Sequence, residues 1–206
     1  MDNSQLAPSD KPINELLICR RIFPEAIAAL STKYQLHYHD ATGPAPVQWL
    51  KSKLKTSHAL LCQLTDPIDA SLLKDAPALK VISNLAVGYD NIDVPQASRQ
   101  GIYVTNTPDV LTHASADHAM TLLLATARRL PEARDYIEKG QWQQWELDQL
   151  CGADLYGQQL GIVGAGRIGL ALAQRARAFG LKIVYHNRTR LSTEIEQSYG
   201  LQFASF

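Results

Sequence analysis

Three glycines with a particular spacing are the residues of this sequence best suited to chemistry. Gly164, Gly166 and Gly169 follow the pattern G-x-G-x-x-G, which receives the pyrophosphate in dinucleotide-binding proteins. The first glycine allows a tight turn, the second lets the backbone approach the phosphates, and the third lets a helix pack closely on a strand. A purely structural glycine-rich turn is the alternative. The candidate cofactor-binding residues here are Gly164, Ala165, Gly166, Arg167, Ile168 and Gly169.

A second group of polar residues follows the next expected strand and bears on which dinucleotide is bound. An NAD site usually has an acidic residue about 20 residues past the glycines, whereas an NADP site has an arginine nearby. The sequence there is His-Asn-Arg-Thr-Arg, and no carboxylate occurs before Glu194. Arg188 and Arg190 could bind a 2′-phosphate, with Asn187 and Thr189 as neutral donors, although solvated loop arginines are the alternative. The pattern favours NADP(H) over NAD(H).

These residues need a strand, a helix and a second strand to position them. Residues 160–163 form a short apolar run before the glycines, and residues 181–185 form another after Gly180, which would close the helix. Between them, apolar residues recur every three or four positions, which predicts one buried helical face. That face would consist of Ile168, Leu172, Ala176 and Phe179. The context therefore supports a dinucleotide site with its phosphates at a helix N-terminus.

Composition limits the other kinds of function. The 206 residues carry 20 basic and 20 acidic side chains, so charge offers no argument for a nucleic acid or membrane partner. The 3 cysteines have no disulfide or zinc spacing, and His37 and His39 lack a third ligand, so we predict no metal site. The polar N-terminal residues show no secretory signal, and the longest apolar stretch, 119–127, is too short for a membrane span. A cytoplasmic protein that acts on a small molecule is expected.

The first half of the chain alternates between strand and helix patterns, which predicts a parallel sheet covered by helices. The expected strands are 16–18, 36–39, 59–62, 81–83 and 102–105, and the expected helices are 24–30, 47–54 and 70–73. A loop containing Gly88 follows the fourth strand, at the end where such sheets bind ligands. Its backbone N–H groups could hold a carboxylate. The candidate substrate-binding residues are Leu85, Ala86, Val87 and Gly88.

Three segments together carry a resemblance to a known family. They are SNLAVGYDNIDV, GIYVTNTPDVLTHASADHAMTLLLATARRLPEA and LYGQQLGIVGAGRIG, in this order between Leu79 and Arg190. The sequence resembles the D-isomer-specific 2-hydroxyacid dehydrogenases, particularly their glyoxylate and hydroxypyruvate reductase branch. The resemblance implies a flavodoxin-like substrate domain over residues 1–108. A linker helix, for which Thr112 is a plausible N-cap, and the first half of a doubly wound Rossmann domain would follow over 109–206.

The resemblance also implies a function and a limit to it. Relatives reduce a small 2-keto acid with NAD(P)H as homodimers, and Trp142 and Trp145 would suit either a dimer or inter-domain surface or a satellite core cluster. No position matches the family's active-site Arg, Glu and His, and only 201–206 remains for a third Rossmann strand. We therefore predict a C-terminally truncated chain without catalytic residues or turnover of its own. Alternatives are a non-catalytic, dinucleotide-sensing corepressor-like relative, or an enzyme for 3-phosphoglycerate, which the lack of basic residues near Gly88 disfavours.

Overall fold

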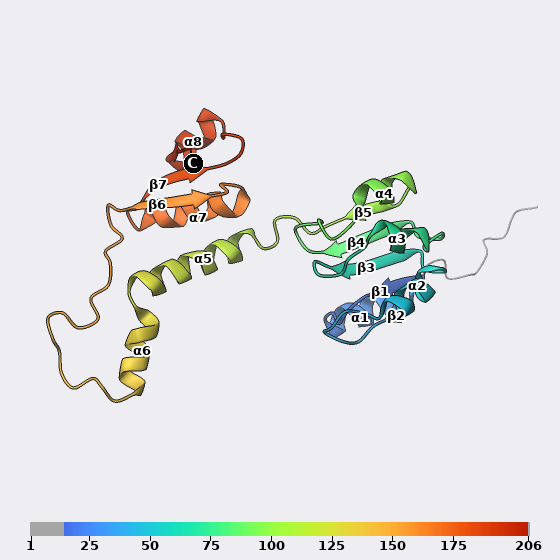
Figure 1. Cartoon of the computed structure of the whole chain (residues 1–206), viewed down its shortest axis with the longest axis horizontal. Helices are drawn as coiled ribbons and strands as arrows, with labels where there is room; N and C mark the ends of the chain where they lie inside the picture. The colour runs from blue at the N-terminus through green and yellow to red at the C-terminus, as the bar shows by residue number, and fades with distance from the viewer. Residues whose placement is uncertain (1–14, 206) are drawn as a thin grey trace, which may run out of the picture. The chain divides into compact units, whose positions relative to one another are not determined.

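The computed structural model describes residues 15–205, so the polar N-terminal segment and Phe206 lie outside the described residues. The chain divides into two compact units, of which the first ends at Pro108 and the second begins at Asp109 (Figure 1). None of the described helices is long and apolar enough to cross a bilayer. Among the same residues, no cluster of His, Cys, Asp and Glu has a geometry that suits a metal ion.

The first unit is built on a parallel sheet with the strand order β2-β1-β3-β4-β5. Its strands are β1 (Glu15–Ile18), β2 (Gln35–Tyr38), β3 (Ala59–Gln63), β4 (Val81–Leu85) and β5 (Tyr103–Thr105). Leu16 pairs with Leu36 on one side and with Ala59 on the other, which places β1 inside the sheet. This is the flavodoxin-like order, so the predicted fold of the unit is confirmed.

Four helices connect the strands of the first unit: α1 (Pro24–Ser31), α2 (Val47–Leu54), α3 (Ala70–Lys74) and α4 (Val94–Arg99). The first three agree with the sequence prediction. The fourth was not predicted, because only Val94 and Ala97 of its six residues are aliphatic. It is nevertheless fixed locally, since the side chain of Asp93 accepts a hydrogen bond from the N–H of Gln96 at 2.9 Å. Leu17, Leu60 and Ile82 of the inner strands are fully buried in the core.

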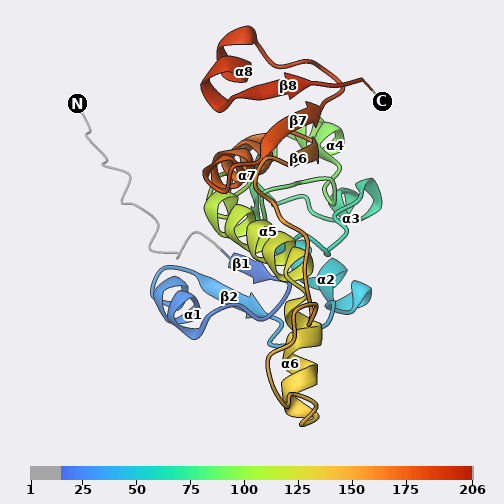
Figure 2. The same ribbon diagram turned by 90° about the vertical axis from the view of Figure 1, so that its left-hand side faces the viewer.

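The second unit contains a parallel sheet with the order β6-β7-β8. Its elements are α5 (Thr112–Ala127), α6 (Leu130–Glu138), β6 (Gln159–Val163), α7 (Arg167–Ala178), β7 (Lys182–His186), α8 (Thr193–Tyr199) and β8 (Leu201–Phe203). Helix α7 lies between α5 and the strands β6 and β7 (Figures 1 and 2). The strand-helix-strand unit around the glycines is therefore as predicted, and residues 201–203 do form a third strand.

Two details of the second unit differ from the sequence prediction. Thr112 is the first residue of α5 rather than its N-cap, a position that Leu111 occupies without a side-chain hydrogen bond. Apolar residues keep helical spacing from Ala116 to Leu130, yet α5 ends at Ala127, because Arg129 has a left-handed backbone with φ 52°. Residues Leu130–Glu138 then start a separate helix with a proline in its first turn.

The buried face of α7 is rotated relative to the predicted one. Ile168 and Phe179 are 40% and 47% exposed, whereas Gly169, Ala173 and Ala176 are buried. Gly169 is the residue at which α7 approaches the turn and β6, since a Cβ there would meet Gly164 and Ile162. Of the predicted face, Ala176 is buried and Leu172 packs against the core, so the prediction was wrong for Ile168 and Phe179.

Candidate dinucleotide-binding site and substrate loop

Two of the three glycines in the turn after β6 are required by the protein itself. Gly164 has a φ of +95°, a conformation that residues with a side chain rarely adopt. A Cβ atom on Gly169 would lie 2.4 Å from the carbonyl oxygen of Gly164, so only glycine fits there. The N–H of Gly164 donates to the carbonyl of His186 at 2.9 Å, which ties the turn to the end of β7.

Gly166 differs, because nothing in the protein requires it to be a glycine. Its φ is −84°, and a Cβ atom would meet no described atom within 4 Å. It borders a hollow with a volume of about 510 Å³. The residues around this hollow are Val163, Gly164, Gly166, His186, Asn187, Arg188 and Thr189. A glycine that opens onto free space is what a closely approaching phosphate needs, so the residues present fit a dinucleotide.

Backbone N–H groups also face the candidate phosphate position. Those of Gly166, Arg167, Ile168 and Gly169 have no hydrogen-bond acceptor among residues 15–205. They belong to the start of the twelve-residue helix α7, where the helix dipole favours an anion. The side chain of Arg167 extends outward and pairs with Asp109, with Nε and Oδ1 3.0 Å apart.

Asn187 supports the turn from the loop after β7. Its Oδ1 accepts a hydrogen bond from the N–H of Ala165 at 2.7 Å. Ala165 is almost fully buried, so its amide is occupied by Asn187 and does not face the hollow. Asn187 was predicted from the sequence as a donor to a phosphate. The structure shows in addition that its side-chain oxygen, Oδ1, holds the glycine-rich turn.

The two arginines of the same loop have different surroundings. Arg190 makes a two-point ion pair with Glu196, through Nε to Oε1 and Nη2 to Oε2, both at 2.8 Å. Its guanidinium also lies 5.5 Å from the centre of the Phe203 ring. Arg188 is exposed and has no hydrogen bond or ion pair with a described residue. Of the two, Arg188 is the one that borders the hollow and is available to a ligand.

Glu196 is the buried centre of a small network that sequence reasoning missed. Its side chain is only 9% exposed, and it accepts a third hydrogen bond from the hydroxyl of Tyr185 at 2.6 Å. The hydrogen bonds from Arg190 and Tyr185 lower the pKa of Glu196 to about 2, and Glu196 in turn raises that of Arg190. A tyrosine in the middle of an apolar strand was the available signal, because a buried hydroxyl needs a partner.

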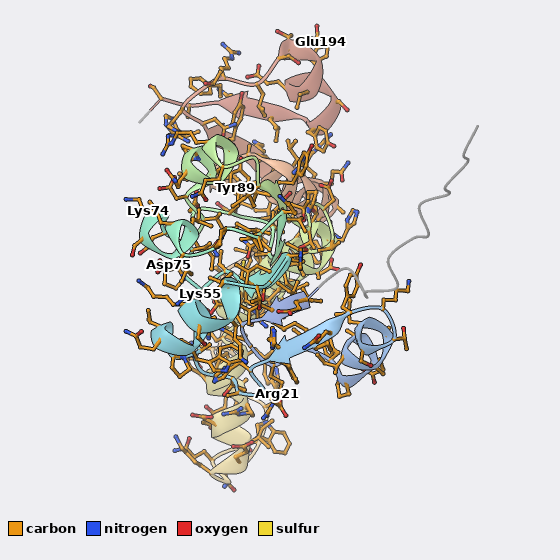
Figure 3. The ribbon with its side chains drawn as sticks, turned by 90° about the vertical axis from the view of Figure 1, so that its right-hand side faces the viewer. Arg21, Lys55, Lys74, Asp75, Tyr89 and Glu194 are labelled. Atoms are coloured by element: carbon orange, nitrogen blue, oxygen red, sulfur yellow. The ribbon has the colours of Figure 1, made fainter. Side chains whose placement is uncertain are left out.

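No carboxylate of residues 15–205 borders the hollow. Glu194, the first acidic residue after the glycines, lies in the exposed first turn of α8 (Figure 3). A hydrogen bond with the Ser192 side chain lowers the pKa of Glu194. The residues around the hollow thus offer a cation and amide groups but no acceptor for a ribose 2′-hydroxyl of the kind an NAD site supplies.

The loop after β4 in the first unit presents free N–H groups. Its carbonyl groups accept hydrogen bonds within the unit: Ala86 from the Thr107 N–H at 2.9 Å, Val87 from Asn106 Nδ2 at 2.7 Å and Gly88 from Asn84 Nδ2 at 2.8 Å. The N–H groups of Ala86, Val87 and Gly88 have no acceptor among the described residues. Leu85 is 47% exposed at the end of the strand. The loop can therefore hold an anion by its backbone.

A pair of asparagines beneath this loop was also not predicted from the sequence. Asn84 is fully buried, and its Nδ2 donates to the Oδ1 of Asn91 at 3.0 Å as well as to Gly88. Asn91 donates in turn to the carbonyls of Gln63 and Asp66, at 3.1 and 2.9 Å. Asn84 shares the buried face of β4 with Ile82, so a polar residue at a core position of a strand was the signal.

Comparison with known proteins agrees with this arrangement. The family model for the D-isomer specific 2-hydroxyacid dehydrogenase, catalytic domain, matches residues 16–202. Glyoxylate reductase from Thermococcus kodakarensis is 45% identical over 195 residues, and glyoxylate reductase from Aeropyrum pernix is 44% identical over 194 residues. These alignments cover 93% and 92% of this chain and 58% of each relative. The chain therefore spans less than two thirds of the length of these curated relatives.

Solved structures lead to the same family. A glyoxylate reductase from Paecilomyes thermophila is 31% identical with a TM-score of 0.75, and the match covers 95% of this chain and 61% of that one. A 2-hydroxyacid dehydrogenase from Ketogulonicigenium vulgare Y25 is 26% identical with a TM-score of 0.76, over 94% of this chain and 59% of that one. From the matched residues, the identity and the shared fold, the chain belongs to the D-isomer specific 2-hydroxyacid dehydrogenase family.

Proposed function

We propose that the protein acts in the NAD(P)-dependent reduction of a small 2-keto acid, glyoxylate or hydroxypyruvate, to its 2-hydroxy acid. The observation that carries this proposal is Gly166, which opens onto a hollow beside the first N–H groups of α7, and these have no acceptor in the described part of the chain. Relatives named glyoxylate reductase, 44% and 45% identical, support the substrate class. A bound nicotinamide dinucleotide would supply the hydride that reduces the carbonyl group.

The second unit, residues 109–206, would consist of the linker helix and the first half of a Rossmann domain, and would bind NADP(H) in preference to NAD(H). Arg188 borders the hollow and lacks another partner among the described residues, so it can pair with a 2′-phosphate. Thr189 and Asn187 would add neutral donors. The described residues around the hollow include no carboxylate, which supports the same preference, since a carboxylate would repel that phosphate.

The first unit, residues 1–108, would be the substrate domain. Leu85, Ala86, Val87 and Gly88 would form the carboxylate-binding loop, in which the N–H groups of the last three donate to the acid. Their carbonyl groups are already bonded within the unit, which keeps the N–H groups oriented without a ligand. Binding by oriented backbone donors costs little reorganisation, so even a small acid can be held.

The 206-residue chain itself would bind dinucleotide without turnover. The family's Arg, Glu and His have no matching position in it, and loss of a general acid alone reduces rates by about 10² to 10⁴. We further propose that the protein forms a homodimer through the region from α6 to β6. Large apolar side chains are exposed there, namely Leu130, Ile137, Trp142, Trp145, Leu147 and Tyr156.

Comparison of NADPH with NADH tests the cofactor proposal. Titrations of the purified chain should show that NADPH binds about 10- to 100-fold more tightly, as expected for hydrogen bonds between a charged pair. Arg188→Ala should remove this difference by weakening NADPH alone. Arg99→Ala, which removes an exposed arginine of α4 in the other unit, should leave it intact. Equal affinities in the unmodified chain, or no binding of either nucleotide, would contradict the proposal. A parallel assay with glyoxylate should show no oxidation of NADPH.

A further inference from the structure

The loop between β7 and α8 is fixed at both of its ends. At the first end, Asn187 accepts a hydrogen bond from Ala165 in the glycine-rich turn. At the other end, the N–H of Leu191 donates to the hydroxyl of Tyr185 at 2.9 Å, and Arg190 is held by Glu196. Arg188 lies between these two attachments, and no described residue pairs with it.

Tyr185 and Glu196 are buried beneath this loop, away from the hollow. Tyr185 is 1% exposed, it connects Leu191 to Glu196, and its ring meets that of Phe203 edge-on with centres 5.5 Å apart. Glu196 uses both oxygens on Arg190 and one of them also on Tyr185. Neither Glu196 nor Tyr185 is among the residues that line the hollow.

We propose that Tyr185 and Glu196 are positioning residues for the 2′-phosphate of NADPH, because they fix Leu191 and Arg190 so that the loop presents Arg188 to the hollow. This inference rests on the proposed preference for NADP(H). In this arrangement Arg190 anchors the loop and Arg188 binds the phosphate. From the sequence, both arginines were candidates for binding the 2′-phosphate. An ordered loop places Arg188 before the nucleotide arrives, which lowers the entropic cost of the contact.

A role for Glu196 in restraining Arg190 would have the opposite effect on NADPH binding. If Arg190 were a second phosphate ligand that Glu196 holds back, removal of the carboxylate would release a cation and strengthen NADPH binding. If Glu196 positions the loop, the same change weakens NADPH binding even though it makes the region more positive. Electrostatics and positioning therefore predict changes of opposite sign for Glu196→Gln.

The experiment compares Tyr185→Phe, Glu196→Gln and the unmodified chain in titrations with NADPH and with NADH. Tyr185→Phe removes one hydroxyl without changing charge. Tyr199→Phe is the matched control, because Tyr199 packs in the same cluster and its hydroxyl has no hydrogen-bond partner among the described residues. Thermal unfolding of each variant is measured in parallel, so that a general loss of stability is separated from a loss of discrimination.

Both variants should lower the affinity for NADPH about 3- to 10-fold and leave that for NADH within about 2-fold, so the ratio of the two falls. Tyr199→Phe should keep the ratio. An unchanged ratio in Tyr185→Phe, or tighter NADPH binding by Glu196→Gln, would overturn the inference while the cofactor proposal stands. If the unmodified chain does not discriminate between the nucleotides, both proposals fail together. Should Tyr185→Phe not fold, Glu196→Gln alone decides by the sign of its effect.

Discussion

At the scale of single residues, the three glycines of the turn after β6 have different physical reasons to be there. Gly164 is needed for its positive φ, and Gly169 for the approach of α7 to the turn. Gly166 has open space around it, so the fold does not explain why this residue is a glycine. A ligand that enters the hollow does. Substitutions at Gly169 and at Gly166 should therefore affect different properties, the stability of the fold and the binding of a ligand.

We expect Gly169→Ala to destabilise the fold and Gly166→Ala to spare it. In Gly169→Ala the new methyl group would meet the carbonyl of Gly164 at 2.4 Å, and overpacking of this kind costs about 1–3 kcal/mol of unfolding free energy. In Gly166→Ala the unfolding free energy should change by less than about 1 kcal/mol, while NADPH binding is lost because the methyl group occupies the path of the phosphates. Thermal or urea unfolding and NADPH titration measure the two effects. Retained affinity in a folded Gly166→Ala variant would contradict a phosphate site here.

At the scale of elements, strand β4 carries the substrate loop and also the polar group that shapes it. Asn84 replaces an apolar residue on the buried face of β4, and its amide holds the carbonyl of Gly88. A buried side-chain amide destabilises the fold unless it is hydrogen-bonded, so the bonds that Asn84 makes are needed for stability. The residue identity in β4 is therefore most constrained at Asn84, next to the substrate loop.

Asn84→Ala should weaken binding of a carboxylate by the loop. The substitution leaves the carbonyl of Gly88 and the Oδ1 of Asn91 without their donor, which costs about 1–3 kcal/mol of stability and releases the loop. Glyoxylate added to the isotope-labelled chain should shift the amide resonances of Val87 and Gly88, and this shift should be reduced or absent in the variant. Ser83→Ala, on the same strand and without a side-chain hydrogen bond to a described residue, serves as the control. If Asn84→Ala responds as the unmodified chain does, the asparagine has no such role.

Most elements were predictable because apolar runs and turn residues mark them locally. The short helices α4 and α8 were not, although each begins after a side-chain cap, Asp93 or Ser192. The glycine-rich turn was found by its spacing together with the strand and helix patterns on either side of it. The pairs Asn84 with Asn91 and Tyr185 with Glu196 could not be found in this way, because the tertiary fold brings them together and neither residue of a pair indicates its partner.

At the scale of the whole molecule, exposed apolar side chains between α6 and β6 are the basis for the proposed homodimer. Trp145 is 74% exposed and Leu147 is 82% exposed. Aromatic anchors of this kind dominate the binding energy of interfaces. The segment is distinct from the glycine-rich turn and from the substrate loop, so self-association can be tested without disturbing either site.

Trp145→Ser should shift the chain from dimer to monomer, with dimer affinity reduced at least about tenfold, because it removes a large apolar contact. Phe23→Ser, at a residue of the first unit that is 77% exposed, should leave the molecular mass unchanged and so acts as the control. Sedimentation equilibrium over a range of concentrations measures the effect. A monomer at all concentrations in the unmodified chain would show that this surface does not mediate self-association.

The strand order of the two sheets has a consequence for how the chain can fold during its synthesis. After β1, each later strand of the first sheet joins an outer edge of those already made: β2 beside β1, β3 on the other side of β1, then β4 and β5 in turn. The strands β6, β7 and β8 follow the same rule, and no described strand of one sheet pairs with the other. None of the described strands therefore has to be inserted between two neighbours that are already paired. Each sheet can grow by one edge at a time as the ribosome releases the chain from its N-terminus.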